Sequence, residues 1–534
     1  MEQWRSIEES SLWEAMASRP AFDLQTGLSH ASIKKRIINA GGGLAYSYAT
    51  MDIDDATIDM LCNISQELDL QGQYRAMLSG EIMNSGEGRM VLHHLTRGEP
   101  MGPVVKNGRN YGSFYRNEQK RIEVFSAKVR SGALKTPAGK NFKQVIQIGI
   151  GGSDLGPRAL YLALEQWARE RGLLKLKASF ISNVDPDDAN AVLASLDPDS
   201  SLFILVSKSG TTQETLANEA LVKAWLTKHG LNPSGHMLTV TSETSPLAGN
   251  PDYLDSFYID DYIGGRYSST SAVGGLMLSL AFGPDAFASM LEGAKEADQL
   301  ALEADAKKNA ALMNALLGIY ERMVLKRPSL AILPYTQALS RFPAHLQQLD
   351  MESNGKRVKR NGKSCTLPTG PIVFGEPGTN GQHSFYQLLH QGTDIIPIEF
   401  IGFKKNQTAF DPDFEGSSAR RKLNANLAAQ IVAFALGKPD PNPNRFFPGN
   451  RPSSLLFGEE LDPRALGALL AHYENKVMFQ GFAWNINSFD QEGVQLGKKL
   501  AGSILEPSNL KSESGSTDKL AQILDSYAEL LGAL

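Results

Sequence analysis

The sequence predicts an α/β protein with two lobes, each built on a parallel sheet that helices flank. From residue 142 onward, short apolar runs alternate with longer amphipathic runs, and this strand–helix alternation is typical of parallel sheets. The length of 534 residues also favours more than one lobe, because single hydrophobic cores stop growing at roughly 250–300 residues. We expect a helical region before the two lobes and a short arm after them.

The pattern divides the chain into four regions. The first contains little β-branched alternation, and its residues 32–40, 56–68 and 71–83 have the periodicity of amphipathic helices. We expect it to pack on the larger lobe. The predicted regions are a helical one over residues 1–110, a first and smaller lobe over 111–290, a second and larger lobe over 291–505, and a C-terminal arm or helix over 506–534.

Within the lobes, each apolar run of strand length is followed by glycines, small polar residues or a helical pattern. In the first lobe we expect strands at 145–150, 178–182, 202–206 and 237–241, and helices at 155–171 and 211–229. A helical stretch over 273–326 leads to the second lobe. There we expect strands at 330–333, 371–374 and 395–401, helices at 382–391, 418–436, 463–473 and 491–500, a loop at 438–453, a polar gap at 508–517 and a last helix from about 519.

Composition excludes several function classes. The chain is 42% hydrophobic and 21% charged, with a net charge of −5, so it has no global basic field and we expect no nucleic-acid or membrane partner. The two cysteines, Cys62 and Cys365, are far apart in the sequence, which favours a reducing compartment. The polar N-terminus lacks a signal peptide, and no apolar run reaches the ~20 residues of a membrane span. We therefore expect a cytoplasmic protein.

Glu352 is the candidate base. Residues 347–356 read Gln-Gln-Leu-Asp-Met-Glu-Ser-Asn-Gly-Lys, after a buried strand and a short helix that begins near Pro343. Asn354 and Gly355 favour the end of that helix, so Glu352 is expected at a helix end above a sheet, where it can face a pocket. A single glutamate is more often a solvated surface acid. The neighbouring motifs favour the functional interpretation.

Two turns in the first lobe are suited to a phosphate or a sugar. Residues 149–156 read Gly-Ile-Gly-Gly-Ser-Asp-Leu-Gly and residues 207–214 read Ser-Lys-Ser-Gly-Thr-Thr-Gln-Glu, each between a strand and a helix. A capping box at 211–214 would use only some of the hydroxyls in the second turn, and clustered hydroxyls at a helix start favour phosphate. The alternative for the first turn is a tight strand–helix turn without a ligand. The alternative for the second is a helix cap that has more hydroxyl groups than a cap needs. A sugar phosphate needs only one turn that binds its phosphate, which we call the phosphate cradle. The other turn would then line the sugar.

Three further motifs carry candidate charged groups. Gly-Gly-Arg-Tyr-Ser at 264–268 presents Arg266 after two glycines, and the glycine-rich segment 375–383 ends in His383 at a helix start. Segment 488–498 places Gln491 and Lys498 seven residues apart, on one face if it is helical. Taken singly, these are more simply a surface arginine, a helix-start histidine and a snorkelling lysine. No spacing typical of a metal site is present.

Together these segments resemble the phosphoglucose isomerase family. The resemblance covers roughly residues 144–498, in the expected order, and its most specific pieces are the motifs at 264–268, 350–356, 378–383 and 488–491. The sequence departs from common family residues at Ser209-Gly210, Leu349, Asn485, Glu492 and Gln495, none of which is a proposed proton-transfer group. The resemblance implies two sugar-isomerase lobes, a homodimer with shared active sites, and no cofactor. It also implies interconversion of glucose 6-phosphate and fructose 6-phosphate, in glycolysis and gluconeogenesis.

The resemblance also implies a role for each matched residue. Glu352 corresponds to the base that carries a proton between C1 and C2, and Arg266 to the cation that stabilises the enediolate. His383 and Lys498 correspond to the ring-opening pair. The residues that resemble phosphate ligands are Ser207, Lys208 through its backbone, Ser209 and Thr212, and those that resemble sugar ligands are Gly152, Ser153, Gly265, Gln348 and Gln491.

Two other functions are compatible with parts of the sequence. A nicotinamide-dependent oxidoreductase would use segment 149–156, but the third glycine of the G-x-G-x-x-G fingerprint is replaced by Asp154. A non-catalytic sugar-phosphate sensor would need the phosphate cradle but not the three proton-transfer candidates. Such sensors often append a basic DNA-binding domain, and the N-terminal region has no basic stripe.

Overall fold

The computed structural model describes residues 4–505 and 518–533. The chain forms two compact units, Met1–Ser488 and Phe489–Leu534. The second unit contains η13 (Glu492–Val494), α17 (Gln495–Leu505) and α18 (Asp518–Leu530), and α18 confirms the last predicted helix. The polar gap predicted at 508–517 lies outside the described residues. None of the described helices combines the length and apolar character that a membrane-spanning segment needs.

The smaller of the two large sheets lies in the first unit and is wholly parallel. Its strand order is β11-β10-β9-β7-β8. The four predicted strands of the first lobe are confirmed within a few residues, and β11 is an addition. The strands are β7 (Gln144–Ile148), β8 (Lys177–Ile181), β9 (Ser201–Val206), β10 (Met237–Thr241) and β11 (Asp255–Tyr258).

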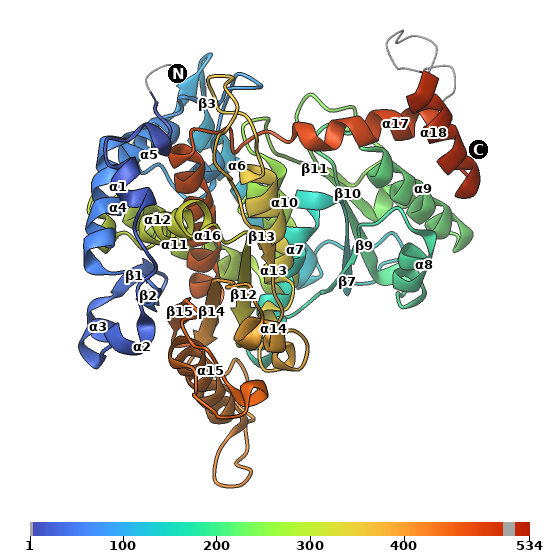
Figure 1. Cartoon of the computed structure of the whole chain (residues 1–534). Coiled ribbons are helices and arrows are strands. Elements are labelled where there is room, and N and C mark those ends of the chain that lie inside the picture. The colour runs from blue at the N-terminus through green and yellow to red at the C-terminus, as the bar shows by residue number, and fades with distance from the viewer. Residues whose placement is uncertain (1–3, 506–517, 534) are drawn as a thin grey trace. The chain divides into compact units, whose positions relative to one another are not determined.

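Helices cover both faces of this sheet. On one face, Val222 and Leu226 of α9 pack with Ile146 and Leu205 of the sheet in a core where these side chains are fully buried. Figure 1 shows α8 and α9 on one side of the strands and α7 and α10 on the other. The helices are α6 (Tyr111–Ser131), α7 (Leu155–Glu170), α8 (Pro186–Ala194), α9 (Gln213–Lys228) and α10 (Ala272–Phe282).

The larger sheet has six strands in the order β1-β2-β15-β14-β12-β13. Strands β15, β14, β12 and β13 are parallel to one another, and β2 pairs with both β1 and β15 in antiparallel fashion. The three predicted strands of the second lobe are confirmed. The strands are β1 (Ile37–Gly41), β2 (Leu44–Thr50), β12 (Ser329–Pro334), β13 (Ile372–Phe374), β14 (Ile398–Phe403) and β15 (Ser453–Gly458).

The hairpin β1–β2 corrects the helix predicted over residues 32–40. Helix α3 (His30–Lys35) ends early, and the chain then turns back through Gly42 and Gly43, whose φ angles are +58° and +77°. Two consecutive residues with positive φ form the tight turn that joins antiparallel strands, and glycine adopts that conformation without strain. The N-terminal region therefore contributes two strands to the sheet of the second lobe. The region boundaries at residues 110, 290 and 505 stay a prediction.

A long buried helix, α16 (Pro463–Ala483), extends well beyond its predicted end at residue 473. Nearly all of its residues are buried, including Glu474. Arg97 pairs with Glu474 and donates from Nη1 to both carboxylate oxygens of Asp298 at 3.2 Å. These ion pairs compensate charges that would otherwise be costly inside the protein. The other helices of the second lobe are α11 (Pro284–Leu300), α12 (Ala310–Ile319), α13 (Phe342–Gln347), α14 (Tyr386–Gln391) and α15 (Ala419–Leu436).

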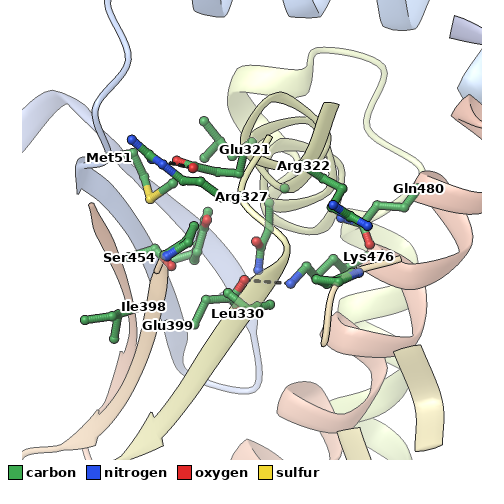
Figure 2. Close-up of a pocket in the computed structure, with 16 residues that line it drawn as sticks. Met51, Glu321, Arg322, Arg327, Leu330, Ile398, Glu399, Ser454, Lys476 and Gln480 are labelled. Carbon is green, nitrogen blue, oxygen red and sulfur yellow. Dashed lines mark hydrogen bonds and ion pairs between the residues drawn. The ribbon is translucent and has the colours of Figure 1, made fainter. Parts of the chain in front are cut away.

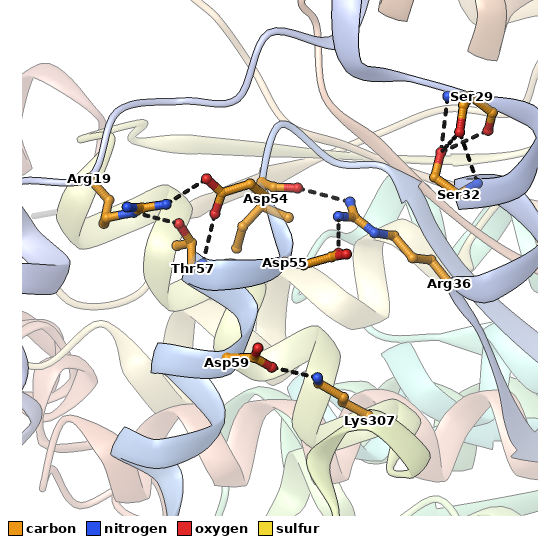
Figure 3. Close-up of polar contacts among 10 residues, drawn as sticks. Arg19, Ser29, Ser32, Arg36, Asp54, Asp55, Thr57, Asp59 and Lys307 are labelled. Carbon is orange, nitrogen blue, oxygen red and sulfur yellow. Dashed lines mark hydrogen bonds and ion pairs between the residues drawn. The ribbon is translucent and has the colours of Figure 1, made fainter.

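Polar contacts fix the N-terminal helices (Figure 3). Arg19 donates to Thr57 at 2.8 Å and pairs with Asp54, whose side chain accepts from the Thr57 N–H and so caps α4. Lys307, from the second lobe, pairs with Asp59 on α4. The N-terminal helices are α1 (Trp13–Ala17), α2 (Leu24–Gly27), α4 (Asp55–Glu67) and α5 (Leu70–Leu78), and the short strands are β3 (Ile82–Asn84), β4 (Arg89–Met90), β5 (Val105–Lys106) and β6 (Arg109–Asn110).

Candidate active site

Glu352 lies on a widened helical turn. Helix α13 has Pro343 in its first turn and runs directly into a π-helical turn, η10 (Gln348–Glu352). The helical conformation ends at Asn354, as the sequence predicts. A π-turn holds more residues than an α-turn and so re-aims the side chains that follow it, which is why such turns are frequent at functional sites. The Glu352 side chain is 23% exposed, so its carboxylate is held by the protein but accessible to a ligand.

Arg266 is buried beside this carboxylate. Its Nη1 lies 3.3 Å from Oε2 of Glu352, and the Arg266 side chain has no exposed surface. Nε donates to Oγ of Ser353 at 2.6 Å, and Nη2 donates to the backbone carbonyl of Ser488 at 2.6 Å. A buried cation is costly unless it is paired and hydrogen-bonded, and these contacts meet that need. The interpretation of Arg266 as a surface arginine is therefore wrong.

Glycines allow two loops to meet next to Arg266. A Cβ atom on Gly152 would lie 2.1 Å from the carbonyl carbon of Gly265, so only glycine permits this contact. It joins η3 (Gly151–Ser153), at the start of α7, to η6 (Gly265–Tyr267). The amide of Gln348 lies on the same side, because its Nε2 would be 3.2 Å from a Cβ on Gly151. The structure thus brings three of the predicted sugar ligands together with Arg266.

The predicted phosphate cradle surrounds the start of α9. The N-cap residue is Thr212 and not Thr211, so the capping box predicted at 211–214 is wrong. Among the described contacts, the Thr212 side chain accepts no N–H of the helix. Oγ of Ser207 accepts from the Gly210 N–H at 3.1 Å and donates to Oγ1 of Thr212 at 3.2 Å. The Ser209 side chain is exposed. The N–H groups at this helix start therefore remain open to an anion, with three hydroxyls around them.

Lys208 connects the cradle to the loop that carries Arg266. Its Nζ donates to the backbone carbonyl of Ile263 at 3.2 Å, immediately before the glycines of that loop. Burial lowers the pKa of Lys208, and the nearby Asp261 carboxylate opposes that shift. Strands β7 and β9 are parallel neighbours, so η3 and the cradle leave the sheet at the same edge. Candidate phosphate ligands, candidate sugar ligands and the Glu352–Arg266 pair thus come together from four segments.

His383 lies apart from this cluster. It belongs to η11 (Asn380–His383), in the segment after β13, and its side chain is exposed. The neighbouring Gln382 holds the segment by donating from Nε2 to the Tyr335 hydroxyl at 2.7 Å and to the Asn426 amide. Among the contacts described for residues 4–505, none joins His383 to Glu352 or Arg266. By the described contacts, His383 is therefore not part of the cluster around Glu352 and Arg266.

The second unit carries the last two candidates. Lys498 lies in α17, whereas Gln491 precedes η13 and is not part of that helix. The prediction that both residues share one helix face is therefore wrong, because the chain changes from a 3-10 turn to an α-helix between them. Both side chains are exposed.

A cavity of about 30 Å³ lies elsewhere in the first unit, between the larger sheet and helices α12 and α16 (Figure 2). Nζ of Lys476 donates to Oε1 of Glu399 at 2.6 Å on its wall, and Arg327 pairs with Glu321 on the other side. None of the candidate site residues lines this cavity. Among the described residues, no three His, Cys, Asp or Glu side chains are grouped as metal ligands.

Comparisons with known proteins show the family to which the chain belongs. The family model described as phosphoglucose isomerase matches residues 47–521. The chain belongs to the phosphoglucose isomerase family. A glucose-6-phosphate isomerase from Treponema denticola is 60% identical over 484 residues, which are 91% of each chain. One from Treponema pallidum strain Nichols is 53% identical over 510 residues, 94% of this chain and 95% of the relative.

Two solved structures share the fold. The crystal structure of a glucose-6-phosphate isomerase from Chlamydia trachomatis matches with a TM-score of 0.91 and 41% identity, over 98% of this chain and 100% of that one. A hypothetical protein from Thermus thermophilus matches with a TM-score of 0.65 and 25% identity, over 85% of this chain and 98% of its own. The predicted α/β fold class is confirmed.

Sequence reasoning missed the groups that hold Arg266. Among the described contacts, Ser353 and the Ser488 carbonyl accept hydrogen bonds from it, and the Tyr267 hydroxyl lies 2.9 Å from Oγ of Ser353. Ser353 and Tyr267 stand in two of the motifs that match the phosphoglucose isomerase family, next to residues that were singled out. No spacing rule connects positions so far apart in the chain, so the sequence gives no signal that they meet.

His345 makes the stability of this family member sensitive to acid. It lies on α13, fully buried, and neither ring nitrogen has a hydrogen-bond partner among the described residues. Burial lowers the pKa of His345 to about 4. The unfolded chain therefore binds this proton below about pH 6.5 while the folded chain does not, so the free energy of unfolding falls by about 1.4 kcal/mol per pH unit as pH drops through that window.

We predict that His345→Phe makes the stability less dependent on pH between 4 and 6.5, because phenylalanine cannot bind the proton. The free energy of unfolding, measured by denaturant titration at several pH values, should differ little from wild type at pH 7.5. At pH 5 the difference should shift in favour of the variant by about 2 kcal/mol. If the free energies of unfolding of variant and wild type differed by the same amount at pH 7.5 and at pH 5, His345 would not contribute to the pH dependence of stability.

Proposed function

We propose that this protein interconverts glucose 6-phosphate and fructose 6-phosphate, by ring opening followed by proton transfer through a cis-enediol. The observation that carries the proposal is the pairing of Glu352 with the buried Arg266, 3.3 Å apart, beside loops suited to a sugar and a phosphate. The curated relatives named glucose-6-phosphate isomerase support the same reaction, since they match more than nine-tenths of the chain.

The chemistry follows from the roles of the two central groups. In the open-chain aldose, the Glu352 carboxylate takes the proton from C2 while electrons move into the C1 carbonyl, which gives an enediolate. The buried Arg266 cation lowers the free energy of that oxyanion. A proton then passes from O2 to O1, the protonated Glu352 gives its proton to C1, and the C2–O2 bond becomes the carbonyl of the ketose. No electron acceptor is needed, because one carbon is oxidised as its neighbour is reduced.

The remaining roles are proposals that rest on the family motifs and on the segments described above. Gly152, Ser153, Gly265, Gln348 and Gln491 bind the sugar. His383 and Lys498 are the ring-opening pair. Ser207, Ser209, Thr212 and the backbone of Lys208 bind the phosphate at the start of α9.

A discontinuous assay tests the proposed function and separates it from the alternatives. The protein is incubated with fructose 6-phosphate and a chelator, without any nucleotide, and glucose 6-phosphate is then measured in the quenched sample. We expect rapid conversion to an equilibrium mixture. A sugar-phosphate sensor would bind the sugar without converting it, and a nicotinamide-dependent oxidoreductase would require the nucleotide. Either result would contradict the proposal.

The phosphate cradle gives a prediction of its own. Replacing Ser209 and Thr212 together with alanine should raise KM about tenfold or more, because two hydroxyl ligands at a helix start are lost. Inhibition by a phosphorylated sugar acid should weaken, whereas inhibition by the same acid without phosphate should not change. Equal weakening of both inhibitors would place the phosphate elsewhere. Ser234→Ala, at a distant turn, is the matched control.

We also propose a homodimer whose active sites are shared, and a cytoplasmic location. The exposed His383, which has no described contact with its own Glu352, supports a histidine that serves the partner subunit. Several large apolar side chains of the second lobe are exposed to solvent, and contact with a second copy would remove such side chains from water. They are Leu388, Phe410, Phe414, Val432 and Phe446. Cys62 and Cys365, both free thiols, are compatible with a reducing compartment.

A further inference from the structure

The contacts around Arg266 indicate a role for a residue that has none among the roles inferred from the family motifs. We propose that Ser353 is a positioning residue, which orients the guanidinium of Arg266 so that its charge faces the oxyanion of the enediolate. The inference rests on the proposed isomerase function. It concerns how the cation is held, and it predicts a change in turnover rather than in the binding of substrate.

Two consecutive residues hold the same guanidinium. Oε2 of Glu352 lies 3.3 Å from Nη1, and Oγ of Ser353 accepts from Nε at 2.6 Å. Because both side chains leave adjacent positions at the end of the π-turn η10, the backbone fixes the base and the cation relative to one another. Effective catalysis requires this kind of fixed geometry, since small misplacements of a catalytic group cost large factors in rate.

The two hydrogen-bond acceptors also set the plane of Arg266. A guanidinium is planar and rigid, so fixing Nε on Ser353 and Nη2 on the Ser488 carbonyl leaves no freedom to rotate about the side-chain axis. Both acceptors are neutral oxygens. They hold the group without compensating its charge, whereas an acceptor carboxylate in either place would reduce the field at the developing oxyanion.

Tyr267 fixes the serine in turn. Its hydroxyl lies 2.9 Å from Oγ of Ser353, and its ring stacks on His93 with centroids 4.9 Å apart. Ser353 is fully buried, so water does not compete for these hydrogen bonds. Burial raises the pKa of Tyr267 to about 12, which keeps its hydroxyl protonated at neutral pH. The serine hydroxyl is therefore confined between a tyrosine and the cation that it orients.

The experiment compares three variants with wild type. Ser353→Ala removes the acceptor for Nε, and Tyr267→Phe removes the group that fixes Ser353. Ser279→Ala is the control, because Ser279 is equally buried in α10 and its Oγ has no hydrogen-bond partner among the described residues. For each, kcat, KM, Tm and two inhibition constants are measured. One inhibitor is a sugar hydroxamic acid phosphate, which mimics the enediolate, and the other is a sugar alcohol phosphate, which has no enediolate-like group at C1 and C2.

We expect Ser353→Ala to lower kcat by about 10- to 100-fold, below the 10²–10³-fold loss typical of removing an oxyanion donor itself. KM and the sugar alcohol inhibition constant should stay within about threefold of wild type, and hydroxamate affinity should fall by a factor similar to that of kcat. Tyr267→Phe should lower kcat and hydroxamate affinity in the same selective way but by a smaller factor. If Ser353→Ala does not fold, the inference is tested with Tyr267→Phe. Ser279→Ala should behave as wild type.

Two results would overturn the inference. One is a Ser353→Ala enzyme with wild-type kcat. The other is equal weakening of both inhibitors, which is the result expected of a merely structural serine. An inactive wild type would instead contradict the proposed function, so the two failures can be told apart.

Discussion

Glu352→Gln should abolish isomerisation while the protein still binds its substrate. Glutamine keeps the size and polarity of the side chain, so the contact with Arg266 persists, but an amide does not accept a proton from carbon. Loss of a general base costs about 10²–10⁴ in rate, and for an unactivated C–H bond we expect the upper end of this range. The measurement is kcat for fructose 6-phosphate, together with the affinity for a sugar alcohol phosphate.

A matched substitution gives the baseline for this result. Glu123→Gln changes an exposed acid on α6, where it pairs with Lys120, and should leave kcat unchanged. If Glu352→Gln retained activity near that of Glu123→Gln, another group would carry the proton. If both kcat and inhibitor affinity collapsed together, Glu352 would be a structural residue.

Mixed dimers should regain activity when Glu352→Gln chains are combined with His383→Ala chains, each inactive alone. If His383 serves the partner's site, one site of the mixed dimer carries both substitutions and is inactive. The other site combines an intact Glu352 with an intact His383 and is active. Co-refolded mixtures should therefore recover up to one working site per mixed dimer. A two-fold interface creates two equivalent shared sites, so this outcome follows from symmetry once His383 crosses the interface.

A second mixture controls for trivial recovery. Glu352 and Arg266 contact each other within one chain, at 3.3 Å, so Glu352→Gln and Arg266→Met chains should not complement. Activity in the first mixture and none in the second identifies His383 as the residue that crosses between subunits. A purified mixed dimer of the first kind that stays inactive would contradict the shared site. So would full activity of His383→Ala alone.

Local patterns predicted the parts of the site that depend on local structure. Asn354 and Gly355 mark a helix end, so the position of Glu352 could be derived, and hydroxyls after a strand indicated the start of α9. The burial of Arg266 could not be derived. It depends on whether acceptors from distant segments, such as Ser353 and the Ser488 carbonyl, reach its nitrogens, and sequence spacing carries no such information.

The fold shows the same division. Buried parallel strands such as β9 are continuous apolar runs and are easily found. The end of α16 was missed because that helix is buried on all sides, and its Glu474 and Lys476 form ion pairs inside the protein. The helix therefore has no polar face, and its sequence lacks the helical alternation of polar and apolar residues. The hairpin β1–β2 was missed although glycines at 41–43 are a turn signal, because the segment before them also has a helical pattern.

The central claim is that Glu352 carries a proton between C1 and C2, and isomerisation in heavy water tests it most directly. Glucose 6-phosphate is incubated in ²H₂O with wild type or Glu352→Gln, and conversion and deuterium at C2 are followed by NMR over many turnovers. The account predicts conversion with growing deuterium at C2 for wild type, and neither for the variant. Conversion by Glu352→Gln at a rate near wild type would contradict it. So would wild-type conversion without any deuterium over many turnovers, because a proton held on a carboxylate exchanges with solvent in some of them.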